Sequence, residues 1–140
     1  IEKVVALAVL MPIVASMGGN AGTQTLTVAV RALAMKELTA SNAVRILGKE
    51  ALVGGINGMV FAVLVGVVAY VWFSSLEIGL VIGAAMIINM IVASLAGLLI
   101  PLGLDRAGVD PALGSSVILT TVTDVVGFFC FLGLAVLILF

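Results

Sequence analysis

The sequence contains no histidine and only one cysteine, Cys130. A single cysteine cannot build an internal disulfide framework, and without histidine the chain lacks a principal ligand of zinc and copper sites. Nucleophilic triads need a base, and histidine is the usual one. We therefore expect no enzymatic activity, whereas binding of a hard cation through oxygen ligands remains possible.

Charged residues are also scarce. They make up 9% of the chain, against 64% hydrophobic residues, and the mean hydropathy is +1.43. Soluble domains are about 25% charged. The net charge of −1 provides no basic surface for nucleic acid. These values predict an integral membrane protein in contact with the lipid bilayer.

Four long apolar stretches predict an all-α fold, a polytopic transmembrane helix bundle. We expect one transmembrane domain over residues 1–140, and its helices are predicted at about 4–34, 50–73, 77–102 and 111–140. The opening residues lead directly into a long apolar stretch, which argues against a cleaved signal peptide.

Two loops, at about 35–49 and 103–110, join helices at the same side of the membrane. Residues 31–50 hold four of the six basic residues, so the positive-inside rule predicts that both loops are cytoplasmic in a multi-pass protein of the cell membrane. The charges form either a solvated face or a docking surface for a cytosolic domain. Ser41-Asn42 and Asp110-Pro111 are predicted to begin the helices that follow.

The first apolar stretch contains an unusual run, Gly18-Gly19-Asn20-Ala21-Gly22-Thr23-Gln24. One interpretation is a small-xxx-small helix contact at Gly18 and Gly22, with Asn20 and Gln24 bonding to other helices. The other is that the glycines loosen the helix and expose backbone carbonyls to a wet cavity. Pro12 is predicted to add a bend.

The last apolar stretch contains a carboxylate, Asp124. At the centre of a membrane helix an aspartate costs about 2.5 to 3.5 kcal/mol on insertion scales. Helical spacing places a polar stripe on this helix, formed by Ser116, Thr120, Thr123, Asp124 and Gly127. Such a stripe lines a water-filled path, a proton relay or a packed polar seam. By contrast, the lone Asn89 of the third stretch favours an interhelical hydrogen bond over a ligand role.

One intramembrane carboxylate is too few for acid proteolysis, which uses two. One carboxylate also provides few ligands for a cation, but a twofold dimer would bring two copies of Asp124 to the axis. Mg²⁺ suits such a site because it dehydrates reluctantly and is bound by one or two carboxylates. Composition alone leaves Mg²⁺, Mn²⁺ and a proton open.

Four motifs of the chain stand out together: the Gly18–Gln24 run, Arg31-Ala32-Leu33-Ala34, Asp110-Pro111-Ala112 and Thr121-Val122-Thr123-Asp124-Val125-Val126-Gly127. In order and spacing they resemble the MgtE family of magnesium transporters and channels. The resemblance implies magnesium transport through a homodimer with one pore on its twofold axis. The first and last helices of residues 1–140 would line that pore.

The resemblance also implies the site. Asp124 would bind a largely hydrated Mg²⁺ with its side chain, and backbone carbonyls would complete the site at Ser116, Thr120, Gly18, Gly19 and Gly22. The pore-lining residues would include Asn20, Thr23, Gln24, Thr27 and Thr123. The family more often has asparagine in place of Ser116, which matters little for a carbonyl.

Two family features have no counterpart among these residues. The family has five membrane helices per subunit, so the first is expected upstream, and it has a cytosolic regulatory domain with a CBS pair. The rival functional hypothesis is a proton-coupled secondary transporter of divalent cations that uses Asp124 as its relay. A third is a structural membrane subunit whose polar stripe only joins helices.

Overall fold

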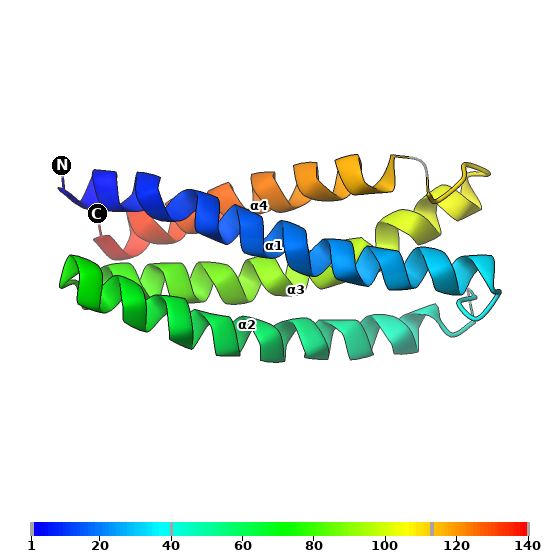
Figure 1. Ribbon diagram of the computed structural model, residues 1–140, viewed down its shortest axis with the longest axis horizontal. Coiled ribbons are helices and arrows are strands. Elements are labelled where there is room, and N and C mark those ends of the chain that lie inside the picture. Colours follow the sequence, from blue (N-terminus) through cyan, green and yellow to red (C-terminus); the bar gives the residue numbers. More distant parts are fainter. Residues whose placement is uncertain (1, 40, 113, 140) are drawn as a thin grey trace.

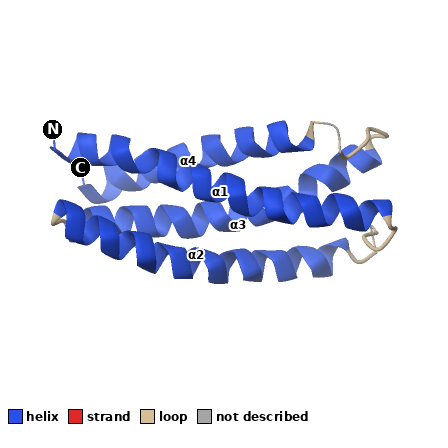
Figure 2. Ribbon diagram, in the orientation of Figure 1, coloured by secondary structure: helices blue, strands red, loops and turns tan. Residues whose placement is uncertain are grey.

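Four long helices account for nearly all of the chain. The computed structural model describes residues 2–39, 41–112 and 114–139. The helices are α1 (Glu2–Ala34), α2 (Ala43–Phe73), α3 (Leu76–Arg106) and α4 (Ser115–Leu139), as Figure 1 shows. Each contains a stretch long and apolar enough to cross a membrane, and every described element is helical (Figure 2). The predicted all-α bundle of four membrane helices is confirmed.

The helices run alternately up and down. Both chain termini lie at the end of the bundle that carries the short α2–α3 turn, and the two longer connections lie together at the opposite end (Figure 1). We call that opposite end the loop end; its connections are residues 35–42 and 107–114. With 31 residues, α2 and α3 each extend about 46 Å, so they project beyond a hydrocarbon core of about 30 Å.

α3 is the central helix. It packs against α1, α2 and α4, and α1 also packs along α4, whereas α1 and α2 barely touch. The α3 sequence is apolar or small around its whole circumference, as expected for a helix with neighbours on several sides. α1 and α4 therefore lie side by side on one flank of α3, and α2 covers another.

α2 begins earlier than the sequence predicted. It starts at Ala43 instead of about residue 50, so Arg45 and Lys49 lie on its first turns and not in a loop. A helix can carry charges once it has left the hydrocarbon region, because water solvates them there. Asn42 occupies the expected N-cap position, but its side chain binds the connection instead, accepting from the Thr39 backbone N–H and donating to the Glu37 carbonyl.

α3 continues past its predicted end at residue 102 to Arg106, with Pro101 inside it. A proline removes one backbone donor and bends a helix without always ending it. Figure 1 shows the last turns of α3 leaving the line of the rest of the helix.

α4 starts at Ser115, four residues after the predicted Pro111. The Asp110 carboxylate accepts from the backbone N–H of Ala112 at 3.0 Å, which closes a local turn instead of capping α4. Gly114 then adopts a φ of +74°, in the left-handed region that interrupts a helix. The predicted cap at Asp110-Pro111 is thus wrong.

Two apolar clusters are separated by a layer of small and polar residues. The larger cluster includes Leu10, Ile82 and Phe131, and the smaller one, toward the loop end, includes Leu98 and Leu102. Between them the helices meet through glycines and buried polar side chains, which we call the glycine layer: Gly18, Gly22, Asn89, Gly97, Thr123 and Gly127. Small residues let membrane helices approach closely.

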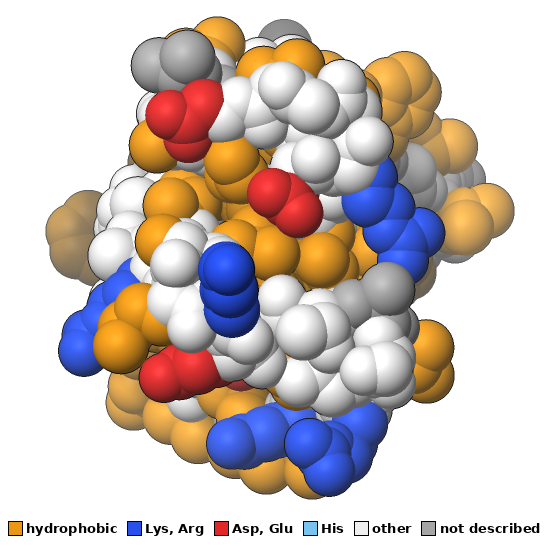
Figure 3. Space-filling model, turned by 90° about the vertical axis from the view of Figure 1, so that its right-hand side faces the viewer, with side chains coloured by type: hydrophobic (Ala, Val, Ile, Leu, Met, Phe, Trp, Pro, Cys, Tyr) orange, Lys and Arg blue, Asp and Glu red, His pale blue; other side chains and the backbone are white. Residues whose placement is uncertain are grey.

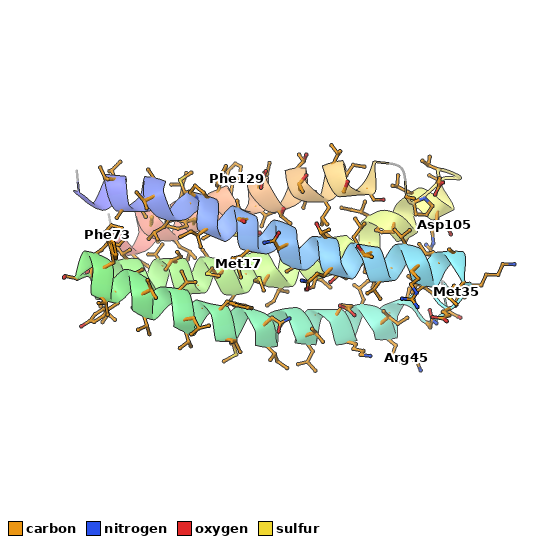
Figure 4. The ribbon with its side chains drawn as sticks, viewed as in Figure 1. Met17, Met35, Arg45, Phe73, Asp105 and Phe129 are labelled. Atoms are coloured by element: carbon orange, nitrogen blue, oxygen red, sulfur yellow. The ribbon has the colours of Figure 1, made fainter. Side chains whose placement is uncertain are left out.

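The loop end carries most of the charge. Figure 3 shows basic and acidic side chains around an apolar interior at this end of the bundle. In the sequence, five of the six basic residues lie between Arg31 and Arg106. Arg45 and Asp105 are labelled there in Figure 4, whereas Phe73 marks the opposite end.

The glycine layer leads to a stability prediction. A Cβ at Gly97 would lie 2.7 Å from the Gly22 carbonyl oxygen and 2.9 Å from the Thr25 Cβ. We expect Gly97→Ala to destabilise the bundle by about 1 to 3 kcal/mol through overpacking of α1 on α3. Gly48→Ala is the matched control, since a Cβ there meets nothing within 4 Å. Unfolding in detergent measures both, and equal stability of the two variants would contradict the close contact.

Candidate functional site

Two rows of polar side chains lie exposed on the surface formed by α1 and α4. We call them the polar rows, and they consist of Asn20, Thr23, Gln24 and Thr27 on α1 and of Ser116, Thr120 and Asp124 on α4. The antiparallel helices set the rows side by side, because Gly19 faces Thr123 and Gly22 faces Leu119. Residues far apart in the sequence thus form one polar face.

Asp124 is the ionisable member of this face within the predicted spans. Its side chain is exposed on the protomer and lies nine residues after the start of α4, or about 14 Å along the axis. About 15 residues of α4 still follow it, which keeps it well inside the span.

The threonine hydroxyls of the polar rows all donate to carbonyls of their own helices. Thr23 donates to the Gly19 carbonyl at 2.7 Å, Thr27 to the Thr23 carbonyl at 2.9 Å and Thr120 to the Ser116 carbonyl at 2.9 Å. A hydroxyl has one hydrogen and two acceptor lone pairs. With the hydrogen already used, these exposed hydroxyl oxygens can only accept from a ligand, such as the water shell of a cation.

The predicted carbonyl ligands fall into two groups. The carbonyls of Gly19, Ser116 and Thr120 each accept a threonine hydroxyl beside the polar rows. The Gly22 carbonyl instead lies against the position of a Cβ on Gly97, toward α3 and away from the exposed face. The Gly22 carbonyl thus lies in a packing contact, and its role as a ligand stays a prediction.

Gly18 and Gly22 act as packing residues. A Cβ on Gly18 would collide with the Asn89 side chain, and one on Gly22 would lie 2.9 Å from the Leu119 side chain and 3.2 Å from the Ala93 carbonyl. The small-xxx-small interpretation is correct for these glycines. The alternative of a loosened helix is wrong, because α1 is continuous from Glu2 to Ala34 and contains Pro12 within it.

Three further predictions concern polar side chains. Asn20 and Gln24 are exposed on the protomer, so they do not lie between helices of this chain. Thr123, predicted to line a pore, is 0% exposed and donates to the Thr120 carbonyl at 3.1 Å. It faces α1 and belongs to the contact behind the polar rows. The interhelical hydrogen bond predicted for Asn89 is confirmed, since its amide donates to the Val14 carbonyl of α1.

One residue was missed. Arg31 is exposed and follows Thr27 by one turn, so it extends the α1 row to the loop end. The i, i+4 spacing from Thr27 was the signal that could have assigned it to the row.

A single copy of the chain offers few ligands for a metal ion. Among the residues described, no group of three or more histidine, cysteine, aspartate or glutamate side chains could hold a metal ion. The polar face supplies one carboxylate, two carboxamides and several acceptor hydroxyls. Such a face suits a hydrated cation bound through its water shell, and a second carboxylate would have to come from another copy of the chain.

Four helices long and apolar enough to cross a membrane, together with an ionisable polar face, are features of the class of membrane proteins to which ion transporters belong. A sequence profile described as "MgtE: Divalent cation transporter" matches residues 11–134. The chain belongs to the MgtE family of divalent cation transporters.

Similar proteins named "Magnesium transporter MgtE" occur in three bacteria. The Enterococcus faecalis protein is 42% identical over 129 residues, which cover 92% of this chain and 28% of that protein. The Bacillus subtilis protein is 33% identical over 96% of this chain, and the Thermus thermophilus protein 35% identical over 99%. The chain thus spans 28 to 31% of the length of these relatives. Membership of a family of transporters agrees with the expectation that the chain is not an enzyme.

Water access to the polar rows can be measured by cysteine labelling in a Cys130→Ser background. Thr27→Cys and Thr120→Cys should react with a membrane-impermeant thiol reagent at least about tenfold faster than Phe129→Cys, because a thiolate forms poorly without water. Phe129 is the control since it is 75% exposed on α4 and points away from the bundle in Figure 4. Equal labelling of all three in liposomes would show that the polar rows are not hydrated.

Proposed function

We propose that this chain forms one half of a dimeric, channel-like pore that conducts hydrated Mg²⁺ across the membrane. Membership of a divalent cation transporter family supports the substrate class. The polar rows of α1 and α4 would line the pore, and Asp124 from each of two protomers would form the selective site.

The observation that carries this proposal is the exposure of Asp124 on a helix able to span a membrane. A carboxylate facing lipid near the bilayer centre costs about 2.5 to 3.5 kcal/mol. Water or a second protein surface removes that cost. Two copies of the chain, related by a twofold axis along the polar rows, would provide both. The rows would then be hidden from lipid and would enclose an aqueous path between the copies.

The chemistry of the rows favours a cation that retains its water. Two Asp124 carboxylates balance the charge of a divalent ion, and the hydroxyls of Thr23, Thr27 and Thr120 accept hydrogen bonds from bound water. Mg²⁺ demands an octahedral shell and gives up water reluctantly. Since Mn²⁺ also takes oxygen ligands, Mn²⁺ is the competing ion that selectivity measurements must include.

The charged loop end sets the orientation that we propose. Its basic residues support a cytoplasmic location by the positive-inside rule, and the opposite end of the bundle would then face outward. A membrane potential contributes about 2.3 kcal/mol per elementary charge per 100 mV, or about twice that for a divalent ion. This is sufficient to drive inward flux, and the loop end is where a cytosolic regulatory domain with a CBS pair would dock.

The alternative is a proton-coupled secondary transporter of divalent cations. The presence of one carboxylate in the polar rows also fits this function, since a relay needs a single titrating group. Its distinguishing property is uptake that follows a pH gradient at constant membrane potential.

The decisive experiment measures Mg²⁺ uptake into liposomes containing the reconstituted chain. Asp124→Asn and Asp124→Ala should lower uptake at least about tenfold, because a charge-assisted interaction worth about 1.5 to 3 kcal/mol is lost at each protomer. Thr121→Val is the matched control, since Thr121 is exposed on α4 outside the polar rows and donates to the Val117 carbonyl. Selective uptake at the parent rate by both Asp124 variants would refute the site, and dependence on a pH gradient would favour the rival.

The dimer has a separate test. In a Cys130→Ser background, Asp124→Cys should cross-link two protomers with a bifunctional thiol reagent, since a twofold axis would place the two positions on opposite sides of one hydrated ion, too far apart for a direct disulfide. Val71→Cys, exposed on α2, is the control and should stay monomeric. Cross-linking of Val71→Cys alone would place the protomer contact on α2 and contradict the proposed axis.

A further inference from the structure

Asn89 is a fully buried amide near the middle of α3. Its side chain is 0% exposed, and its Nδ2 donates to the Val14 carbonyl of α1 at 3.0 Å. The other polar atom, Oδ1, is also buried and has no hydrogen-bond partner among the described residues. Native proteins rarely leave a buried acceptor unpaired, so an unpaired one requires an explanation.

Glycines on both neighbouring helices make room for this amide. A Cβ on Gly18 of α1 would collide with the Asn89 side chain, and a Cβ on Gly127 of α4 would lie 3.0 Å from its Nδ2. Gly127 is itself close to α1, since a Cβ there would lie 3.6 Å from the Val14 side chain. Asn89 therefore enters the junction of α1 and α4 from behind, and its amide touches both helices.

This junction lies directly behind the polar rows. On α1, Gly18 adjoins Gly19, whose carbonyl accepts the Thr23 hydroxyl. On α4, Gly127 follows Asp124 by three residues, within the same helical turn. A change in the position of either helix against Asn89 would therefore shift the polar atoms on the neighbouring, exposed surface.

We propose that Asn89 is a positioning residue that holds α1 and α4 at the separation required for cation discrimination at Asp124. Its donated hydrogen bond holds α1, and its contact with Gly127 holds α4. If Asn89 served only to fill space, a leucine of similar shape would serve as well and would leave no acceptor unpaired. The proposed role of the amide therefore depends on its hydrogen bond to α1 and not on its volume alone. The effect on selectivity rests on the proposed function, whereas the effect on helix separation does not.

The helix separation can be measured without transport. A Cβ on Gly19 would lie 3.9 Å from the Thr123 Oγ1, the atom that the sulfur of Thr123→Cys would replace, so the two cysteine side chains would be neighbours. The pair Gly19→Cys and Thr123→Cys, in a Cys130→Ser background, should therefore oxidise readily. Adding Asn89→Leu or Asn89→Ala should change the oxidation rate about threefold or more, within the range observed for remote coupling.

Ser94→Ala is the matched control. Ser94 is a second buried polar residue of α3, but it lies against Gly54 of α2, away from the polar rows. It should leave the cross-linking rate unchanged. An unchanged rate in both Asn89 variants, or the same change in Ser94→Ala, would overturn the proposal.

A second readout uses uptake by the chain with native Gly19, Thr123 and Cys130, normalised to folded protein. Asn89→Leu should change the ratio of Mg²⁺ to Mn²⁺ uptake about threefold or more, whereas a purely structural role would lower both rates equally. If the parent chain lacked Mg²⁺ selectivity, the proposed function would fail while the cross-linking result would still decide the positioning role.

Gly127→Ala tests the same contact without a change at Asn89, which covers the case in which Asn89 variants fold poorly, and the double variant with Asn89→Ala tests whether the two residues act through each other. Gly127→Ala should by itself disturb the cross-link, because its Cβ would press on the Asn89 amide, and Asn89→Ala should relieve that pressure. A smaller effect of Gly127→Ala in the Asn89→Ala background than in the parent background supports contact through Asn89. Equal disturbance by Gly127→Ala with and without Asn89 would refute it.

Discussion

The close approach of α1, α3 and α4 at the glycine layer is the constraint on which the polar rows depend. Lipid tails are as apolar as leucine side chains, so membrane helices associate through tight packing and interhelical hydrogen bonds more than through hydrophobic burial. Gly22 and Gly97 bring α1 onto α3, and Gly18 and Gly127 admit the Asn89 amide. α1 and α4 consequently lie against each other in one register.

The register of α1 against α4 also decides where the polar side chains lie. The space between α1 and α4 is occupied by glycines and by buried side chains such as Thr123 and Leu119, so larger polar groups can only point outward. The threonines satisfy their hydrogens on their own helices, and Asp124 remains on the surface. A protomer with this surface is poorly matched to lipid, which is why we propose that it is completed by a second copy around a hydrated ion.

The same argument separates the two kinds of polar residue in this chain. Asn89 and Ser94 are buried and act between helices, whereas Asn20, Gln24 and Asp124 are exposed within the predicted spans. Both kinds are costly in a membrane, yet only the exposed kind requires water or a partner. Membership of the MgtE family, together with this distribution, favours the α1–α4 face over α2, whose exposed surface is mostly apolar.

The sequence by itself determined the four helices, the polar stripe around Asp124 and the family, because apolar length, helical spacing and motif order are local properties. It placed the start of α4 wrongly, since Asp110 could either cap a helix or close a turn, and the choice depended on the left-handed Gly114. Only the tertiary structure decided that Gly18 and Gly22 serve packing, that Thr123 is buried and that Asn89 reaches α1 and α4. Those facts depend on how three helices are rotated against one another, and helix rotation follows from packing between distant residues.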